Sequence, residues 1–288
     1  MEIMKRVGLI FLLTVFVLGF SMIPAASEPT LEKIKNSGVF TIGVRNASPP
    51  FAFINKQNER VGFSIDLAKL VHKNIEKKLG KNIKLEMKET APATRIPLLT
   101  SMAVDLITET MTDTRARRDS VDFSLTFFAT GAQFIIKKGT PIKGAKDIAG
   151  KRIGTQQGST NERVLREKYP KAVLVTFPDQ AAAFLALQQA KLDAYCNDGI
   201  QLWGLKFKSP NPDQWEVVGD YISYEPYGMA MRKNDSDFRQ AVNVALMEAI
   251  EGGEYFKIYD KWFGPKSDVP YPMDSQTKSF LMLQVVPK

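Results

Sequence analysis

Short apolar runs alternate with amphipathic segments along most of the chain. Residues 39–44 and 133–136 have the length and composition of buried strands, and residues 63–78 carry apolar side chains at helical spacing. A second series of the same kind begins with the strand-like residues 150–155 and continues to residues 173–177. This alternation predicts an α/β fold built around largely parallel sheets.

The two series share a short internal match. Leu187 precedes Asp193 at the same spacing at which Leu99 precedes Asp105, and each aspartate opens an apolar strand after an amphipathic helix. The match predicts two lobes of like construction. Chance similarity between two short segments is the alternative interpretation.

The C-terminal part of the chain continues the pattern and then changes character. Residues 215–218 and 227–231 are strand candidates, and residues 238–250 have the periodicity of a long helix. Prolines interrupt the pattern from Pro265 onward. Residues 266–288 are therefore expected to form an extension that is packed on the surface or partly loose.

The N-terminus has the layout of a secretory signal peptide. Lys5 and Arg6 precede the apolar run at residues 7–20, and small side chains follow at residues 25–27. The apolar run is shorter than the ~20 residues that a membrane-spanning helix needs. We expect residues 1–27 to be removed and the mature protein to lie in the periplasm, with an uncleaved anchor as the alternative.

Composition excludes several classes of function. The formal net charge of +8 is spread along the chain, without the aromatic interleaving or the module of a nucleic-acid-binding protein. One cysteine, Cys196, cannot form an internal disulfide. One histidine, His72, lies on a predicted helix face, so a His/Cys metal site or a Ser-His-Asp triad is not expected. We therefore expect no metal and no cofactor.

A first candidate ligand segment, residues 109–117, follows the predicted strand at Asp105. Ligands of open α/β folds bind beyond the carboxyl ends of the strands. There the hydroxyls of Thr110 and Thr112 can surround a carboxylate, while Arg117 clamps it through two charge-assisted hydrogen bonds. A helix cap followed by a solvated basic turn is the alternative.

Two further segments carry polar groups in comparable positions. Ser159 and Glu162 fit a capping box, and a capped helix start also favours an anion. Asp198 follows the apolar residues 194–196, where an aspartate is usually a helix cap or a surface group. A ligand contact is the second interpretation of Asp198.

Several short motifs follow one another in a fixed order over most of the chain. They are PPFAF at residues 49–53, VGFSIDL at 61–67, RIPLL at 95–99, MTDTRAR at 111–117, VDFS at 121–124 and YGMA at 227–230. In this order and spacing, from Leu31 to Phe263, the chain resembles the polar-amino-acid class of bacterial periplasmic solute-binding proteins that serve ABC transporters. It is most similar to the glutamate/aspartate-binding members.

The resemblance implies a two-lobed periplasmic-binding-protein fold of type II. Two α/β lobes would be joined by two crossing hinge strands, near residues 127–133 and 217–223, with the ligand between the lobes. The expected domains are 28–127 with 221–265 for lobe 1, 128–220 for lobe 2, and 266–288 for a C-terminal extension.

The resemblance also implies roles for the polar residues noted above. Arg117 would bind the α-carboxylate of an amino acid, and Asp198 would bind its α-amino group. Hydroxyl groups would assist at this end: Thr112 with Ser159 or Thr160 at the carboxylate, and Thr110 with a further hydrogen bond. A zwitterion needs one fixed cation and one fixed anion, so these roles agree with the reasoning from the residues alone.

At the side-chain end of the ligand, the resemblance points to Arg45 and Arg95 as cations for an acidic side chain, and to Gln180 where relatives carry a histidine. Pro92 and Glu109 depart from the family pattern. An inward, unpaired Glu109 would favour lysine-like or amide ligands. We favour a Glu109 paired with Arg45 or Arg95, which leaves one free cation, because an unpaired buried carboxylate is costly.

The leading interpretation is a monomeric receptor without chemistry of its own, which delivers glutamate or aspartate to the membrane permease of an ABC transporter. A rival is an enzyme, since the same fold resembles cyclohexadienyl dehydratases, with Glu109 as general acid. A sensing module is a third class.

Overall fold

The structure is a computed structural model that describes residues 28–287. Its first large sheet contains β1 (Val39–Val44), β5 (Lys84–Glu89), β6 (Leu106–Ile107), β7 (Val121–Thr130) and β13 (Glu225–Arg232). The strand order is β5-β1-β6-β13-β7. We call the part of the chain built on this sheet the first lobe.

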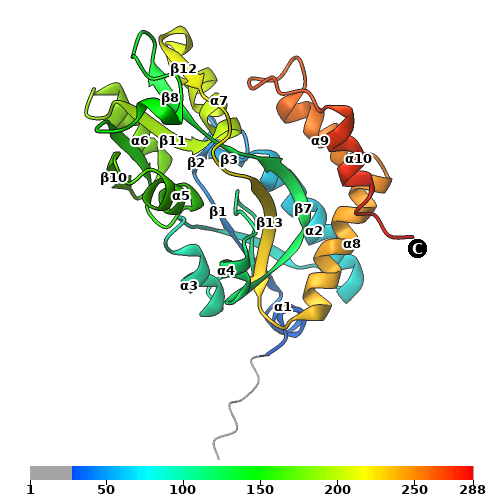
Figure 1. Ribbon diagram of the computed structural model, residues 1–288. Coiled ribbons are helices and arrows are strands. Elements are labelled where there is room, and N and C mark those ends of the chain that lie inside the picture. The colour runs from blue at the N-terminus through cyan, green and yellow to red at the C-terminus, as the bar shows by residue number, and fades with distance from the viewer. Residues whose placement is uncertain (1–27, 288) are drawn as a thin grey trace, which may run out of the picture.

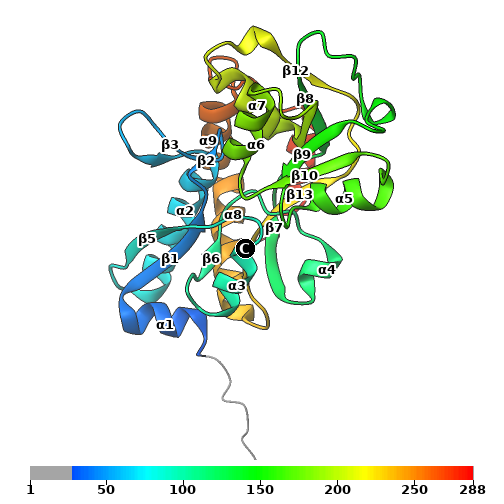
Figure 2. The ribbon, with the colours of Figure 1, turned by 90° about the vertical axis from the view of Figure 1, so that its left-hand side faces the viewer.

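The second large sheet contains β8 (Ala132–Lys137), β9 (Arg152–Gln156), β10 (Val173–Phe177), β11 (Ala194–Asp198) and β12 (Trp215–Val218). Its strand order is β10-β9-β11-β8-β12. We call the part built on it the second lobe. Figure 2 shows the second lobe above the first.

The prediction of largely parallel sheets is correct for only one side of each sheet. β1 pairs in parallel with β5 and β6, and β9 pairs in parallel with β10 and β11. The remaining pairings, those of β13 with β6 and β7 and of β8 with β11 and β12, are antiparallel. In each sheet a single strand runs against the other four, β13 in the first and β8 in the second, and each of these strands adjoins a crossing between the lobes.

The chain crosses between the lobes twice. One crossing lies at Gly131, between β7 and β8, and the other lies between β12 and β13. A Cβ atom on Gly131 would lie 2.4 Å from Tyr221 Cγ and 2.5 Å from the Ser223 carbonyl oxygen. The two crossings therefore pack so closely that only glycine fits. The residue boundaries predicted for the two lobes stay a prediction.

Helices cover the sheets of both lobes. The first lobe has α1 (Thr30–Ser37), α2 (Phe63–Leu79), α3 (Arg95–Thr100), α4 (Arg115–Arg118), α8 (Ser236–Glu251), α9 (Glu254–Phe263) and α10 (Ser275–Met282). The second has η1 (Ala145–Asp147), α5 (Thr160–Lys168), α6 (Gln180–Gln188), α7 (Gly199–Lys208) and η2 (Pro212–Gln214). Local signals explain several helix ends: Asp179 and Asp235 cap α6 and α8 with their carboxylates, and Gly80 ends α2 in the left-handed region.

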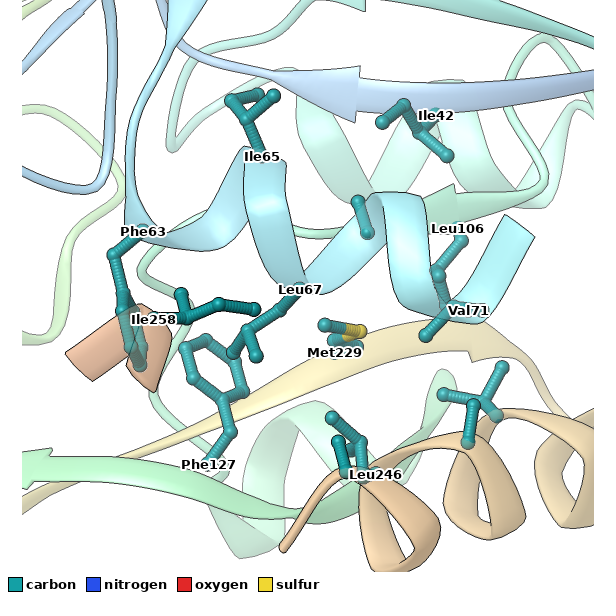
Figure 3. Close-up of a cluster of buried hydrophobic side chains, with 14 of the residues drawn as sticks. Ile42, Phe63, Ile65, Leu67, Val71, Leu106, Phe127, Met229, Leu246 and Ile258 are labelled. Atoms are coloured by element: carbon teal, nitrogen blue, oxygen red, sulfur yellow. The ribbon is translucent and has the colours of Figure 1, made fainter. Parts of the chain in front are cut away.

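The largest apolar core belongs to the first lobe. Figure 3 shows Leu67 and Val71 of α2 packed among Met229 of β13 and Leu246 of α8, all buried. This is the face that the predicted helical spacing of residues 63–78 presents. The predicted strands at residues 39–44, 173–177 and 215–218 are confirmed with the same bounds.

The internal match between the two series has a structural counterpart. Asp105 accepts a hydrogen bond from the Thr41 N–H at 3.0 Å, and its own N–H donates to the Thr41 carbonyl. Asp193 does the same with Arg152, accepting from its N–H at 2.7 Å. In each lobe the aspartate thus ties the start of an inner strand to its parallel neighbour, as expected for lobes of like construction.

The sequence pattern predicted neither the small sheet that follows β1 nor the helix in the C-terminal tail. β2 (Ala47–Ser48), β3 (Ala52–Ile54) and β4 (Arg60–Val61) form a three-stranded sheet around the cis peptide bond Pro49-Pro50. The tail forms α10, which runs alongside α8 and α9 in Figure 1. The Gln284 amide pairs with both the N–H and the C=O of Thr126 on β7, at 3.0 and 2.9 Å.

Other expectations concern single residues and the N-terminus. His72 bonds to the Ile83 carbonyl oxygen at 2.6 Å from its helix face, as predicted for a structural histidine. Cys196 is a buried free thiol, and burial raises its pKa well above the ordinary value. The predicted signal peptide at residues 1–27 lies outside the described residues. Within residues 28–287 no helix has the length and apolar character needed to cross a membrane.

Candidate functional site

Arg117 lies where the first lobe meets the second. Thr114 caps the short helix α4 by accepting from the Arg117 N–H, so the predicted cap is present. The guanidinium donates from Nη1 to the Thr112 carbonyl at 2.8 Å and from Nη2 to the Gly158 carbonyl of the second lobe at 3.4 Å. Burial, followed by the positive charge of Arg95, lowers the pKa of Arg117 to about 9. It remains cationic at neutral pH and would gain from an anionic partner.

Asp198 supplies a buried negative charge on the second lobe. It ends β11 and stands before α7, yet its side chain makes no cap hydrogen bond to that helix. Its carboxylate instead accepts from Asn161 at 2.8 Å, Gln201 at 3.1 Å and the Tyr227 hydroxyl at 2.5 Å. Burial, followed by the negative charge of Glu225, raises the pKa of Asp198 to about 6. A cation beside it would offset both effects.

Glu109 lies between the two arginines that the sequence analysis assigned to the side-chain end. Its Oε2 is 3.6 Å from Arg45 Nε and 3.5 Å from Arg95 Nη1, and Thr90 donates to its Oε1 at 2.5 Å. All three charged side chains are buried. Glu109 is therefore flanked by two cations at ion-pair distance, although its Oε2 accepts no hydrogen bond within the described chain.

Gln180 is buried at the N-terminus of α6 and connects the lobes. Its amide nitrogen donates to the Ala47 carbonyl of the first lobe at 2.5 Å, and its oxygen accepts from Asn197 at 3.1 Å. With the amide oxygen of Gln156 turned toward the donors, it accepts from the Gln180 N–H at 2.9 Å and from Arg45 Nη2. Gln180 thus lies beside Arg45 through their shared Gln156 amide, and its role at the side chain of the ligand stays a prediction.

Several buried polar atoms around these residues lack a partner within the described chain. They include Thr110 Oγ1, Arg95 Nε and Asn161 Oδ1, while the Thr110 carbonyl accepts from Arg95 at 3.3 Å. Buried polar groups in native proteins are nearly always hydrogen-bonded. A polar ligand is a natural partner for such a group of atoms.

The Ser159 hydroxyl forms its hydrogen bonds within its own helix start. Its hydroxyl accepts from the Glu162 N–H at 3.0 Å and donates to the Gln156 carbonyl at 2.7 Å. The Glu162 carboxylate accepts from the Gly158 N–H rather than from that of Ser159, so the predicted capping box is present in a shifted form. Of the expected hydroxyl ligands, Ser159 therefore has no free donor left.

Thr112 and Thr160 come from different lobes and share one partner that the sequence analysis missed. Both hydroxyls donate to Oε2 of Glu225, at 2.5 and 2.6 Å, and Ser223 donates to the other oxygen at 2.5 Å. Glu225 is almost completely buried at the start of β13. The expected carboxylate-binding hydroxyls thus already face a carboxylate of the protein.

The lobes are in contact around the site. A Cβ atom on Gly158 would lie 2.9 Å from Ala93 Cα, and Ser48 donates to the Gln201 amide oxygen at 3.0 Å. Beside Arg45 and Gln180 the lobes enclose a cavity of about 240 Å³, lined also by Thr90 and Asp179. This cavity opens next to the charged end of the site.

Other contributors had weak signals in the sequence. Asn161, Gln201 and Thr90 are single polar residues on helices or after a strand, and nothing in their spacing separates them from surface positions. Tyr227 lies in a motif that was noted without a role. Among residues 28–287 no group of three or more His, Cys, Asp and Glu side chains could hold a metal ion.

Comparison with known proteins finds solute-binding proteins that match most of the chain. The family model described as bacterial extracellular solute-binding proteins, family 3, matches residues 40–265. The L-glutamate/L-aspartate-binding protein of Pseudomonas aeruginosa is 33% identical over 263 residues, covering 88% of this chain and 87% of the relative. The ABC transporter glutamine-binding protein GlnH of Bacillus subtilis is 34% identical over 239 residues, covering 82% and 85%.

Among solved structures, an ancestral amino-acid-binding protein described as a precursor of cyclohexadienyl dehydratase is 31% identical, with a TM-score of 0.73, and covers 81% of this chain and 99% of its own. The relatives from Pseudomonas aeruginosa and Bacillus subtilis are both named as binding proteins. Like them, this protein is a binding protein and not an enzyme. Glu109, the residue considered as a general acid, is engaged by two arginines. The chain therefore belongs to family 3 of the bacterial extracellular solute-binding proteins, the solute-binding components of amino-acid ABC transporters.

Proposed function

We propose that this protein binds one acidic amino acid, glutamate or aspartate, between its lobes and delivers it to the permease of its ABC transporter. The observation that carries the proposal is a pair of opposite charges where the lobes meet, the half-buried Arg117 on the first lobe and the buried Asp198 on the second. A zwitterion offers a carboxylate to the guanidinium and an ammonium to the carboxylate. Each charge then gains the partner that a buried ion needs.

The end of the site at Arg45 and Arg95 supports an acidic side chain on the ligand. Arg45 and Arg95 both face the single carboxylate of Glu109, so this end has one positive charge in excess. Arginine suits the planar, bidentate recognition of a carboxylate. The relative from Pseudomonas aeruginosa is named for glutamate and aspartate, which supports the same assignment.

Glutamine is a second candidate because the site as a whole is balanced in charge. Three arginines oppose three acids: Arg45, Arg95 and Arg117 against Glu109, Asp198 and Glu225. A ligand without net charge preserves that balance, whereas glutamate adds a negative charge. The relative from Bacillus subtilis is named for glutamine.

Competition calorimetry at neutral pH among glutamate, aspartate, glutamine and lysine tests the proposal. We expect glutamate or aspartate to displace the others, and Arg45→Ala to weaken glutamate about tenfold or more while changing glutamine less. Glutamine winning, with Arg45→Ala without effect on it, would establish the second candidate. Lysine winning would contradict both and make Glu109 the residue that selects the ligand.

We infer that the mature protein is a periplasmic monomer whose lobes close on the ligand by a hinge at the two crossings. Mass spectrometry of the exported protein, beginning at Glu28, would test the cleavage. Light scattering would test the monomer. Small-angle scattering should give a smaller radius of gyration with saturating ligand than without it.

A further inference from the structure

Glu225 connects the two lobes through hydroxyl groups. It stands at the start of β13, where the chain returns from the second lobe to the first. Thr112 belongs to the first lobe and Thr160 to the second, and both donate to the same oxygen of Glu225. Ser223 donates to its other oxygen. The carboxylate is thus held by a hydroxyl from each lobe and by one from the crossing.

These contacts determine what the two threonines can offer a ligand. A hydroxyl has one hydrogen to donate and two lone pairs to accept. Thr112 and Thr160 each donate their hydroxyl hydrogen to Glu225. The two hydroxyl oxygens lie 3.4 Å apart. What remains on both hydroxyls is acceptor capacity. A carboxylate has no hydrogen to donate, so it cannot form a hydrogen bond with these two hydroxyls.

The carboxylates near the two threonines also favour a cationic group of the ligand. Glu225 is close enough to Asp198 for the two negative charges to repel, and Asp198 accepts a hydrogen bond from Asn161, which follows Thr160 on α5. The guanidinium of Arg117, which interacts with the charges of both carboxylates, donates to the carbonyls of Thr112 and Gly158. The region between Thr112, Thr160 and Asp198 therefore combines hydroxyl acceptors with negative charge.

We propose that Glu225 is a positioning residue that makes this region selective for the α-ammonium group, by turning the hydroxyls of Thr112 and Thr160 into acceptors and by adding a second negative charge behind them. The inference rests on the proposed function, in that the ligand is an amino acid whose ammonium lies at Asp198. It reassigns both threonines from the carboxylate of the ligand to its amino group.

The test compares an amino acid with the 2-hydroxy acid of the same skeleton, in the wild type, Glu225→Gln and Glu216→Gln. Glu216 is a partly buried carboxylate on β12, outside the site, so it controls for the loss of a glutamate. Calorimetry with L-glutamate and with 2-hydroxyglutarate, or with glutamine and its hydroxy analogue if glutamine is the ligand, gives the dissociation constants.

We expect Glu225→Gln to weaken the amino acid about 30-fold or more, as loss of a buried charge partner does. The hydroxy acid carries no cation, so its affinity should change less than about threefold or improve, because the freed hydroxyls can donate to it. Glu216→Gln should leave both dissociation constants unchanged. The preference for amino over hydroxy acid should therefore fall about tenfold or more in Glu225→Gln alone.

Two results would overturn the inference: equal losses for both ligands, which would mean that Glu225 only holds the lobes together, or an amino-acid affinity within about threefold of the wild type. If the hydroxy acid binds no variant, the amino-acid titration decides alone. If the wild type binds no amino acid, that result would instead contradict the proposed function. Thr160→Val provides the same comparison if Glu225→Gln does not fold, with the same ligand-dependent loss expected.

Discussion

Gly204 of α7 lies directly against Pro49 of the other lobe, where a Cβ atom on the glycine would be 2.1 Å from the Pro49 carbonyl oxygen. The nearest obstacle is backbone rather than a flexible side chain. A methyl group at this position can therefore be accommodated only if the lobes move apart.

Gly204→Ala should weaken ligand binding, because the ligand gains its full set of partners only when the lobes meet. Overpacking a tight contact costs about 1–3 kcal/mol, or roughly 5- to 150-fold in Kd. The melting temperature without ligand should change little, since the lobes can separate. Gly150→Ala is the control: its Cβ meets nothing within 4 Å but the residue has a φ of +73°, so it should lower stability and leave Kd unchanged. Equal Kd values for Gly204→Ala and wild type would contradict this account.

Arg117→Ala should abolish useful binding of any α-amino acid. Truncating one partner of a hydrogen-bonded charge pair that the bound ligand buries costs about 2–5 kcal/mol, which moves a micromolar site toward the millimolar range. Arg115→Ala, two positions away on the same helix and exposed, is the matched control and should bind as the wild type does. Isothermal titration of both variants measures the difference, and an Arg117→Ala Kd within about threefold of wild type would remove the carboxylate assignment.

Glu109→Gln should shift the preference of the site toward acidic ligands. The substitution keeps an acceptor for Thr90 but leaves both Arg45 and Arg95 without their shared carboxylate. The ratio of glutamate to glutamine affinity is expected to rise about tenfold or more. Glu89→Gln, an exposed residue at the neighbouring cavity, should leave the ratio as it is. A ratio that falls in Glu109→Gln would mean that Glu109 does not oppose acidic ligands.

Binding should depend on pH through Asp198. Its pKa of about 6 in the ligand-free protein means that below pH 6 the carboxyl must lose a proton before it can pair with an ammonium. We expect Kd to be constant above pH 7 and about tenfold weaker at pH 5. Calorimetry in buffers of different ionisation enthalpy should detect proton release at pH 5 and none at pH 8; the same Kd at both pH values would argue against an ammonium at Asp198.

The same group affects stability in the opposite direction. The folded pKa of Asp198 lies above its ordinary value of 3.8, so between these values the folded state binds more protons than the unfolded state. The contribution of Asp198 to the free energy of unfolding therefore falls as pH rises from 3.8 to 6. Asp198→Asn should remove this dependence in denaturant titrations of the ligand-free protein, and an unchanged slope would mean that other groups cause it.

Sequence reasoning reached the elements that local patterns define and missed contacts that only the assembled fold creates. Arg45, Glu109 and Asp198 each follow an apolar strand, so their placement at strand ends could be predicted from periodicity. Glu225 also borders a strand, but its position between Thr112 and Thr160 depends on where β13 returns from the second lobe. No local pattern records that return.

The topology of β13 has a consequence for the order in which the protein can fold. The second sheet is made from the continuous segment between β8 and β12, so it can be complete as soon as residue 218 is available. In the first sheet β7 is joined to β1, β5 and β6 only through β13. Much of this lobe is synthesised first, yet its sheet stays in two parts until β13, at residues 225–232, has emerged after the whole second lobe. The earlier lobe in the sequence is thus the later one to be completed.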